Sequence, residues 1–90
     1  MGDKNKVHLT VLTLSGNYSD DFNIHQKLQH VIDVTFNKLN ITPAPNETWV
    51  LKYNGNVLNP SQTIQDAGLP DGAQLELAPV EGGGGAWIGR

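Results

Sequence analysis

The fold of this chain is decided by the stretch Trp49-Val50-Leu51-Lys52-Tyr53-Asn54-Gly55-Asn56-Val57-Leu58. Its first half is rich in aromatic and β-branched residues, which favour a strand over residues 49–53. Asn54-Gly55 follows, and this pair strongly indicates a hairpin because both central positions of a type I′ turn need positive φ. A short strand is therefore expected around Val57-Leu58.

Two further strands are expected before this hairpin. Residues 7–14 are rich in β-branched side chains and at first alternate between apolar and polar residues. Residues 15–17 are expected to break this run as a turn, and residues 18–24 to form a weaker strand that pairs with the first. Residues 1–6 are polar and are expected to be a flexible N-terminus.

The spacing of apolar residues becomes helical between residues 26 and 40. This spacing predicts an amphipathic helix whose apolar stripe packs on the core. Asn40 is expected to end the helix, and Pro43 and Pro45 then forbid its continuation. The stripe consists of Leu28, Val31, Ile32, Thr35, Phe36 and Leu39.

The remainder of the domain is expected to complete the sheet. Residues 59–69 predict a short connection with one helical turn, in which Ile64 and Leu69 point inward. Pro70-Asp71-Gly72 is a second turn signal. Residues 73–78 alternate again as the final strand, which ends the sheet. The element order β-β-α-β-β-β places the chain in the α+β class.

Composition limits the classes of function. The chain has 90 residues, a formal net charge of -3 and six Lys and Arg, so neither a nucleic-acid partner nor a membrane surface is expected. The absence of Cys excludes disulfides, thiolate metal sites and a Cys nucleophile. No apolar run approaches a membrane span and no signal-peptide core is present, so a cytoplasmic location is expected.

Few side chains suggest catalysis or metal binding. His25 and His30 have a poor helical spacing for metal ligands, so these two and His8 are expected to be surface histidines, and no metal site is expected. Asp20-Asp21 and Asp66 are expected to be turn or cap residues. Trp49 is expected to be half-buried packing at the start of its strand.

With these elements in place, the chain resembles a β-grasp domain and, more narrowly, ubiquitin. The first matching segment, Thr13-Leu14-Ser15-Gly16-Asn17, resembles ubiquitin's first hairpin. The second, Tyr53-Asn54-Gly55-Asn56-Val57-Leu58, resembles its aromatic-x-Gly-x-x-Leu turn, and Thr63-Ile64-Gln65-Asp66-Ala67-Gly68-Leu69 resembles its Thr-Leu-x-Asp-Tyr-x-Ile segment. The resemblance covers about residues 7–84. It implies a ubiquitin-like domain over residues 7–79, with a mixed sheet of four to five strands and one helix packed across it.

The long helix, the Pro-containing connector and the glycine-rich tail also resemble those of bacterial ubiquitin-like proteins encoded beside conjugation genes. This resemblance implies an E1-like activating enzyme, an E2-like conjugating enzyme and a JAMM-type deubiquitinase-like peptidase as partners, together with a target protein. The chain would then be a protein modifier, a substrate and carrier that is not itself an enzyme and needs no cofactor.

Residues 80–90 form the glycine-rich tail, in which Gly82-Gly83-Gly84-Gly85 precedes Ala86-Trp87-Ile88-Gly89-Arg90. A glycine run orders poorly, but its bare backbone can pass through a narrow enzyme channel. Counted without gaps from Leu75, ubiquitin's terminal Gly-Gly falls on Gly83-Gly84. The resemblance implies that a peptidase removes the extension over residues 86–90. The exposed glycine carboxylate would then be adenylated, passed to an enzyme Cys and conjugated through an isopeptide-type bond.

Two other interpretations of the tail stay open. A β-grasp sulfur carrier would form a thiocarboxylate at its terminal glycine, although such carriers usually end at Gly-Gly. A non-covalent binding or adaptor module would use the glycines only as a flexible linker. Trp87 and Ile88 could dock on a partner or on the domain's own sheet, or could simply be tolerated beyond a processing point.

The resemblance also indicates a possible partner surface at Leu14, Lys52 and Ala78. These positions match ubiquitin's apolar recognition patch, with Lys52 in place of its central isoleucine. A charge buried there without a partner would weaken binding, so generic ubiquitin-binding domains are not expected to recognise this chain.

Overall fold

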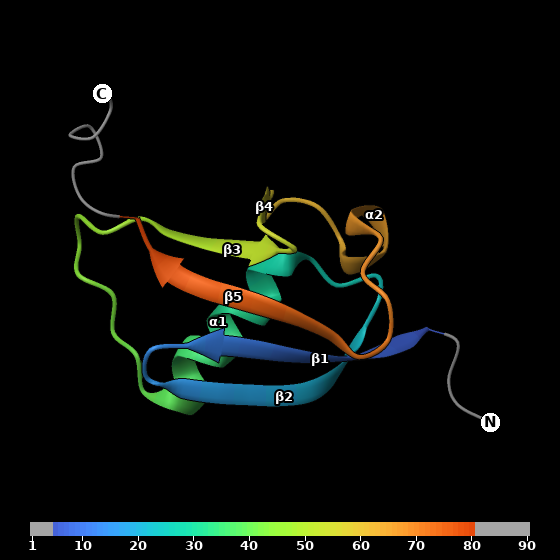
Figure 1. Cartoon of the computed structure of the whole chain (residues 1–90), viewed down its shortest axis with the longest axis horizontal. Helices are drawn as coiled ribbons and strands as arrows, with labels where there is room; N and C mark the ends of the chain where they lie inside the picture. The colour runs from blue at the N-terminus through green and yellow to red at the C-terminus, as the bar shows by residue number, and fades with distance from the viewer. Residues whose placement is uncertain (1–4, 81–90) are drawn as a thin grey trace.

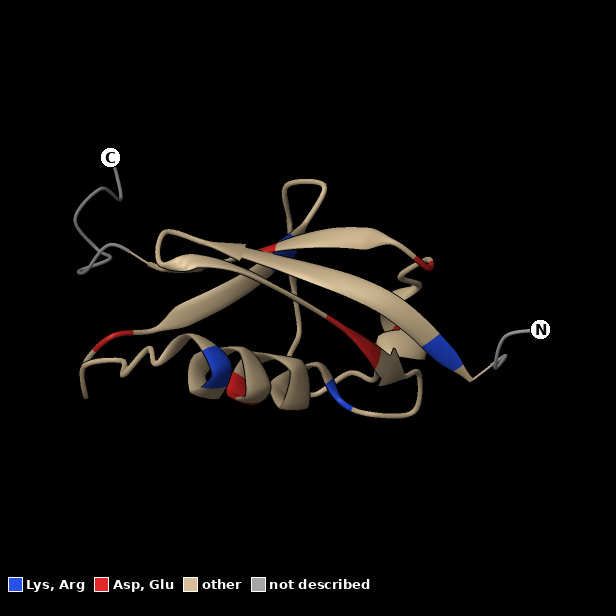
Figure 2. Ribbon diagram, turned by 90° about the horizontal axis from the view of Figure 1, so that it is seen from below, with Lys and Arg blue, Asp and Glu red and all other residues tan. Residues whose placement is uncertain are grey.

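The structure, a computed structural model, describes residues 5–80. Its strands are β1 (Lys6–Thr13), β2 (Gly16–Asn23), β3 (Trp49–Tyr53), β4 (Asn56–Leu58) and β5 (Ala73–Pro79), and its helices are α1 (Leu28–Leu39) and α2 (Ile64–Ala67). The strands form one mixed sheet in the order β2-β1-β5-β3-β4, and α1 lies across one face (Figure 1, Figure 2). This is the α+β, ubiquitin-like β-grasp arrangement that the sequence predicts.

β5 is the central strand, although it comes last in the chain. It pairs parallel with β1, from Leu9 opposite Ala73 to Leu12 opposite Glu76. On its other side it pairs antiparallel with β3. The end of the described chain is therefore held by two neighbouring strands, one on each side.

The turn between β1 and β2 is tighter than expected. Thr13 pairs directly with Gly16, so the turn consists of Leu14 and Ser15, and the second strand begins before Tyr18. The Thr13 hydroxyl explains this, because it donates to the Gly16 carbonyl at 2.8 Å and accepts the Ser15 N–H at 2.9 Å. Gly16 itself has a φ of 135°, a conformation that favours glycine.

Helix α1 is shorter at its start than the apolar spacing predicts. No side chain caps its N-terminus. Instead, the N–H groups of Leu28 and Gln29 donate to the carbonyls of Gln62 and Pro60, so a distant connection fixes where the helix begins. Its end is as predicted, because Asn40 adopts the left-handed conformation with a φ of 56°.

The core lies between the sheet and α1 (Figure 2). The apolar stripe of α1 faces it, and the buried Thr35 hydroxyl donates to the Val31 carbonyl at 2.8 Å. Ile64 and Leu69 are both buried, as predicted. The buried apolar residues are Leu9, Val11, Phe22, Leu28, Val31, Ile32, Leu51, Ile64, Leu69, Ala73, Leu75 and Leu77.

The two turns that frame the sheet are confirmed. Asn54 and Gly55 have φ values of 53° and 81°, which the type I′ turn between β3 and β4 requires. Gly72 has a φ of 87°, and the Ala73 N–H closes the preceding turn on the Pro70 carbonyl at 3.1 Å.

The interpretation of the acidic residues as turn or cap residues is wrong for Asp20 and Asp21, which lie within β2 opposite Leu9 and His8. Asp66 is in the first turn of α2, but the residue that caps this helix is Thr63, whose hydroxyl accepts the Asp66 N–H at 3.0 Å. Strand propensity is low for Asp, and pairing with the core strand β1 overrides it.

Candidate functional site

The first candidate site is the place where β5 leaves the sheet. The Val80 N–H donates to the Thr48 carbonyl at 2.7 Å, which closes the ladder with β3. Pro79 stands opposite Trp49, between two hydrogen-bonded pairs, so its missing N–H interrupts no bond of this ladder. Strand β5 ends at Pro79, one residue beyond the end at Ala78 that the sequence predicts.

Trp49 anchors this exit to the helix. Its ring packs edge-on against Phe36, with centroids 5.1 Å apart and an interplanar angle of 80°. Its indole N–H donates to the Glu47 carboxylate at 3.1 Å, and that carboxylate also accepts the Ala44 N–H at 2.9 Å. These two hydrogen bonds, the Ala44 bond first, lower the pKa of Glu47. The half-buried packing role expected for Trp49 is confirmed.

The residues expected to carry the chemistry lie beyond this exit. The conjugation and processing residues Gly82, Gly83, Gly84 and Gly85 are outside the described residues, and so are Ala86, Trp87, Ile88, Gly89 and Arg90 of the removable extension. What the structure does fix is their origin, because the chain is hydrogen-bonded to the sheet up to Val80.

The second candidate site is a groove of about 560 Å³ on the outer face of the sheet, which we call the outer groove. Two of its residues, Lys52 and Glu76, stand opposite each other on β3 and β5, and Val50 stands opposite Ala78. Val57 contributes an apolar side chain that is 61% exposed. The groove is lined by Val50, Lys52, Val57, Glu76, Ala78, Pro79 and Val80.

The structure brings together two of the three residues of the possible partner surface. Lys52 and Ala78 both line the outer groove. Leu14 is 99% exposed at the β1–β2 turn and lines a separate hollow of about 260 Å³, which shares Ala78 and Glu76 with the groove. The three residues therefore lie on one face, with Leu14 at its margin.

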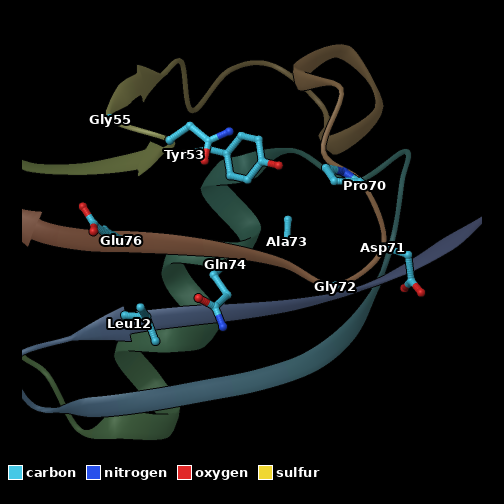
Figure 3. Close-up of a pocket in the computed structure, with 10 residues that line it drawn as sticks. Leu12, Tyr53, Gly55, Pro70, Asp71, Gly72, Ala73, Gln74 and Glu76 are labelled. Carbon is cyan, nitrogen blue, oxygen red and sulfur yellow. The ribbon is translucent and has the colours of Figure 1, made fainter.

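A third depression, of about 410 Å³, lies at the opposite end of β5 (Figure 3). The β3–β4 turn, the Pro70–Gly72 turn and the start of β5 surround it. Figure 3 shows the Tyr53 side chain lying between the two turns. The Asp71 side chain points away from the Tyr53 ring. Both turn signals are evident in the sequence, but the proximity of the two turns depends on the sheet order.

A polar cluster on the β1–β2 hairpin also escaped the sequence analysis. His8 Nδ1 lies 2.9 Å from an Asp21 carboxylate oxygen, and the His8 backbone N–H donates to Asp71 at 2.7 Å. On β2, the Tyr18 hydroxyl donates to the Asp20 carboxylate at 2.6 Å. This bond raises the pKa of Tyr18 to about 12 and lowers the pKa of Asp20.

The expectation that the three histidines lie on the surface is confirmed, because His8, His25 and His30 are all exposed. Within residues 5–80, no group of three or more His, Cys, Asp or Glu side chains is arranged to hold a metal ion. In the same range, neither helix is long and apolar enough to cross a bilayer.

Solved structures share the fold of this chain. The chain is similar to the archaeal “Caldiarchaeum Subterraneum Ubiquitin”, with a TM-score of 0.70 and 17% identity over 87% of this chain and 98% of that one. It is also similar to a protein designed on ubiquitin, with a TM-score of 0.73 and 20% identity over 90% of this chain and 96% of that one. A third match, described as “Molecular Mimicry of SUMO promotes DNA repair”, has a TM-score of 0.74 and 17% identity over 84% of this chain and 94% of that one. The chain thus has the ubiquitin-like β-grasp fold.

Comparison of sequences gives the particular family. Residues 2–85 match the family described as “Protein of Unknown function (DUF2604)”, and the chain belongs to it. The matched range reaches the last of the four glycines. No curated protein matches the chain by sequence.

Proposed function

We propose that this protein is a ubiquitin-like modifier that is processed at its C-terminal glycines and conjugated to targets through one of them. A peptidase cuts within or just after the glycines and removes a tail that includes residues 86–90. An E1-like enzyme then adenylates the exposed glycine carboxylate with ATP, releasing pyrophosphate. The acyl group then passes to an enzyme Cys as a thioester, with release of AMP. An E2-like enzyme delivers it to an amine or hydroxyl of a target protein. The need for ATP agrees with a cytoplasmic location.

The single observation that carries this proposal is the position of the glycines in the sequence relative to the last described residue. Val80 is hydrogen-bonded to Thr48, and only Glu81 separates it from Gly82. A β-carbon in this segment would clash in a channel that fits only bare backbone, so a glycine run is what such a channel would select.

The reach of the segment is also sufficient. Because Val80 is held by the sheet, the segment begins there, and the four residues to Gly84 span about 13 Å when extended. A carboxylate at Gly84 could therefore enter a catalytic channel while the folded domain stays outside it. The catalytic groups belong to the partner enzymes in this scheme, so the chain itself is not an enzyme.

The experiment is ATP–pyrophosphate exchange with the E1-like enzyme of the same genome, before and after treatment of the chain with the JAMM-type peptidase. We expect exchange only after trimming, because the extension keeps the glycine carboxylate in a peptide bond. Intact mass would identify the new end, which we expect between Gly83 and Gly85, with Gly84 favoured.

Equal exchange rates for the full-length and trimmed chains would remove the processing step from the proposal. Trimmed chain that gains one sulfur in place of oxygen would indicate a sulfur carrier. A chain that is neither trimmed nor activated, but binds a partner, would be an adaptor module with a glycine linker.

A further inference from the structure

We infer that the outer groove is the docking site of the chain's own Trp87-Ile88 segment before that segment is removed. The docking itself needs no enzyme and is independent of the proposed function. Its consequence, that processing uncovers the groove, rests on the proposed function.

The groove suits an apolar occupant. Three of its lining residues are the cross-strand partners Val50 and Ala78 and the apolar Val57, which is 61% exposed. Val57 and Leu14 are the large apolar side chains that residues 5–80 leave exposed, and Val57 belongs to this groove. Covering Val57 would therefore remove one of the two main exposed apolar surfaces of the described domain.

The tail begins at the groove itself. Val80, the last described residue, is one of the lining residues. Within residues 81–90, Trp87 and Ile88 are the large apolar side chains. They are also the part of the tail whose exposure to water costs most.

The length of the tail permits the contact. Trp87 lies seven positions after Val80 in the sequence, enough for about 23 Å of extended chain. The last lining residues of the described chain, from Glu76 on β5 to Val80 just beyond it, extend over about 13 Å. Gly82–Gly85 can adopt positive φ without a steric penalty, so this segment can reverse the chain over the outer face.

The charges at the groove match the same occupant. Lys52 is one of the lining residues, and a lysine ammonium group can lie over the face of an indole ring. Glu76 presents a carboxylate on the neighbouring strand, and the tail carries a single cation, Arg90, three residues beyond Trp87. A reversed tail can place this cation near that carboxylate. Lys52, which is expected to deter generic ubiquitin-binding domains, can thus favour the Trp87 ring.

The test is a nuclear magnetic resonance comparison of full-length chains, in which no partner enzyme is present. In the wild-type chain we expect Overhauser contacts between the Trp87 ring and the methyl groups of Val57 and Val50. We expect Trp87→Ala to abolish them and to shift the amide signals of Val57 and Ala78, while the signals of β2 stay unchanged.

Two surface variants serve as a matched pair. Val57→Asp places a charge inside the groove and should abolish the Trp87 contacts, whereas Leu14→Asp changes the other exposed apolar side chain and should preserve them. The shifts should not change on tenfold dilution, because the contact is within one chain.

Absence of the Trp87 contacts in the wild-type chain would overturn the inference. Contacts that fade on dilution would do so too, since they would show that the occupant is the tail of a second copy. Neither result bears on the proposed function, because trimming and activation can proceed whether or not the tail docks. Conversely, a docked tail in a chain that is never activated would refute only the proposed function.

Discussion

At the residue scale, the β1–β2 hairpin shows how the register determines the chemistry of individual side chains. Tyr18 and Asp20 lie on the same side of β2 and share a hydrogen bond of 2.6 Å. This bond favours the protonated phenol and the ionised carboxylate together, so it moves the two pKa values in opposite directions.

A titration tests this pair. In a Tyr53→Phe background, the Tyr18 phenol should ionise at a pKa of about 12, as measured by ultraviolet absorbance. Asp20→Asn should move this pKa towards the ordinary value of about 10. Because the folded-state pKa of Tyr18 is raised, its contribution to stability is complete below pH 10 and is lost between about 10 and 12. An unchanged Tyr18 titration in Asp20→Asn would contradict the assignment.

A second residue-scale prediction concerns the β3–β4 turn. Gly55 has a φ of 81°, and a β-carbon there would meet nothing within 4 Å, so any cost of Gly55→Ala is conformational. We expect a loss of about 1 kcal/mol in the free energy of unfolding, measured by denaturant titration. Gly55→Asn should lose less, because Asn tolerates this region better. An equal loss in both variants would argue against conformational strain.

The sequence predicted the positive φ of Asn54 and Gly55 because that signal is local. It did not predict the contact between His8 and Asp21, because that contact depends on the register. A turn at residues 15–17 would have placed His8 opposite Ile24, whereas the two-residue turn places it opposite Asp21. The Thr13 side-chain bonds that tighten this turn depend on the folded geometry.

At the scale of elements, the apolar stripe of α1 accounts for most of its burial. Ile32 is 4% exposed and lies in the same core cluster as Leu9, Val11 and Leu75. We expect Ile32→Ala to lower the free energy of unfolding by about 2–5 kcal/mol in a denaturant titration. Asn37→Ala, on the exposed side of α1, should stay within about 0.5 kcal/mol. Equal midpoints for the two variants would contradict the packing described above.

The short helix α2 depends on its cap instead. The Thr63 hydroxyl accepts the Asp66 N–H, while the N–H groups of Ile64 and Gln65 donate to the carbonyls of Gln26 and Ile24. Thr63→Ala should cost about 1 kcal/mol, and Thr63→Ser should retain most of the stability in the same thermal-melting experiment. If Ser were no better than Ala, the hydroxyl would not be the stabilising group.

The elements themselves were predictable, because apolar period and turn residues specify them locally. The residues at which the elements begin and end were less predictable. The start of α1 is set by carbonyls of Pro60 and Gln62, and the end of β5 by the Thr48 carbonyl, all distant in sequence. The outer groove escaped the sequence analysis as well, because its residues come from three strands. Only Lys52 and Ala78 were singled out, through the resemblance to ubiquitin.

At the scale of the whole molecule, the fold and the proposed function reside in different segments. Residues 5–80 build a β-grasp domain that solved ubiquitin-like structures share at 17% to 20% identity. Chains with such low identity can share a fold because they share the spacing of their apolar core residues. The fold alone therefore does not define the function. The proposed chemistry depends on the glycines that follow, and on the way β5 presents them from the centre of the sheet.

The most direct test of the central claim is the Gly83→Val and Gly84→Val double variant, assayed with the peptidase, the E1-like and E2-like enzymes, ATP and a target protein. The wild-type chain should form covalent adducts that have lost residues 86–90, as seen by mass spectrometry. The double variant should be neither trimmed nor conjugated, because its β-branched side chains block the channel, and its melting temperature should match that of the wild type. Adducts of the double variant at the wild-type yield would contradict the account and would leave the glycines as a linker.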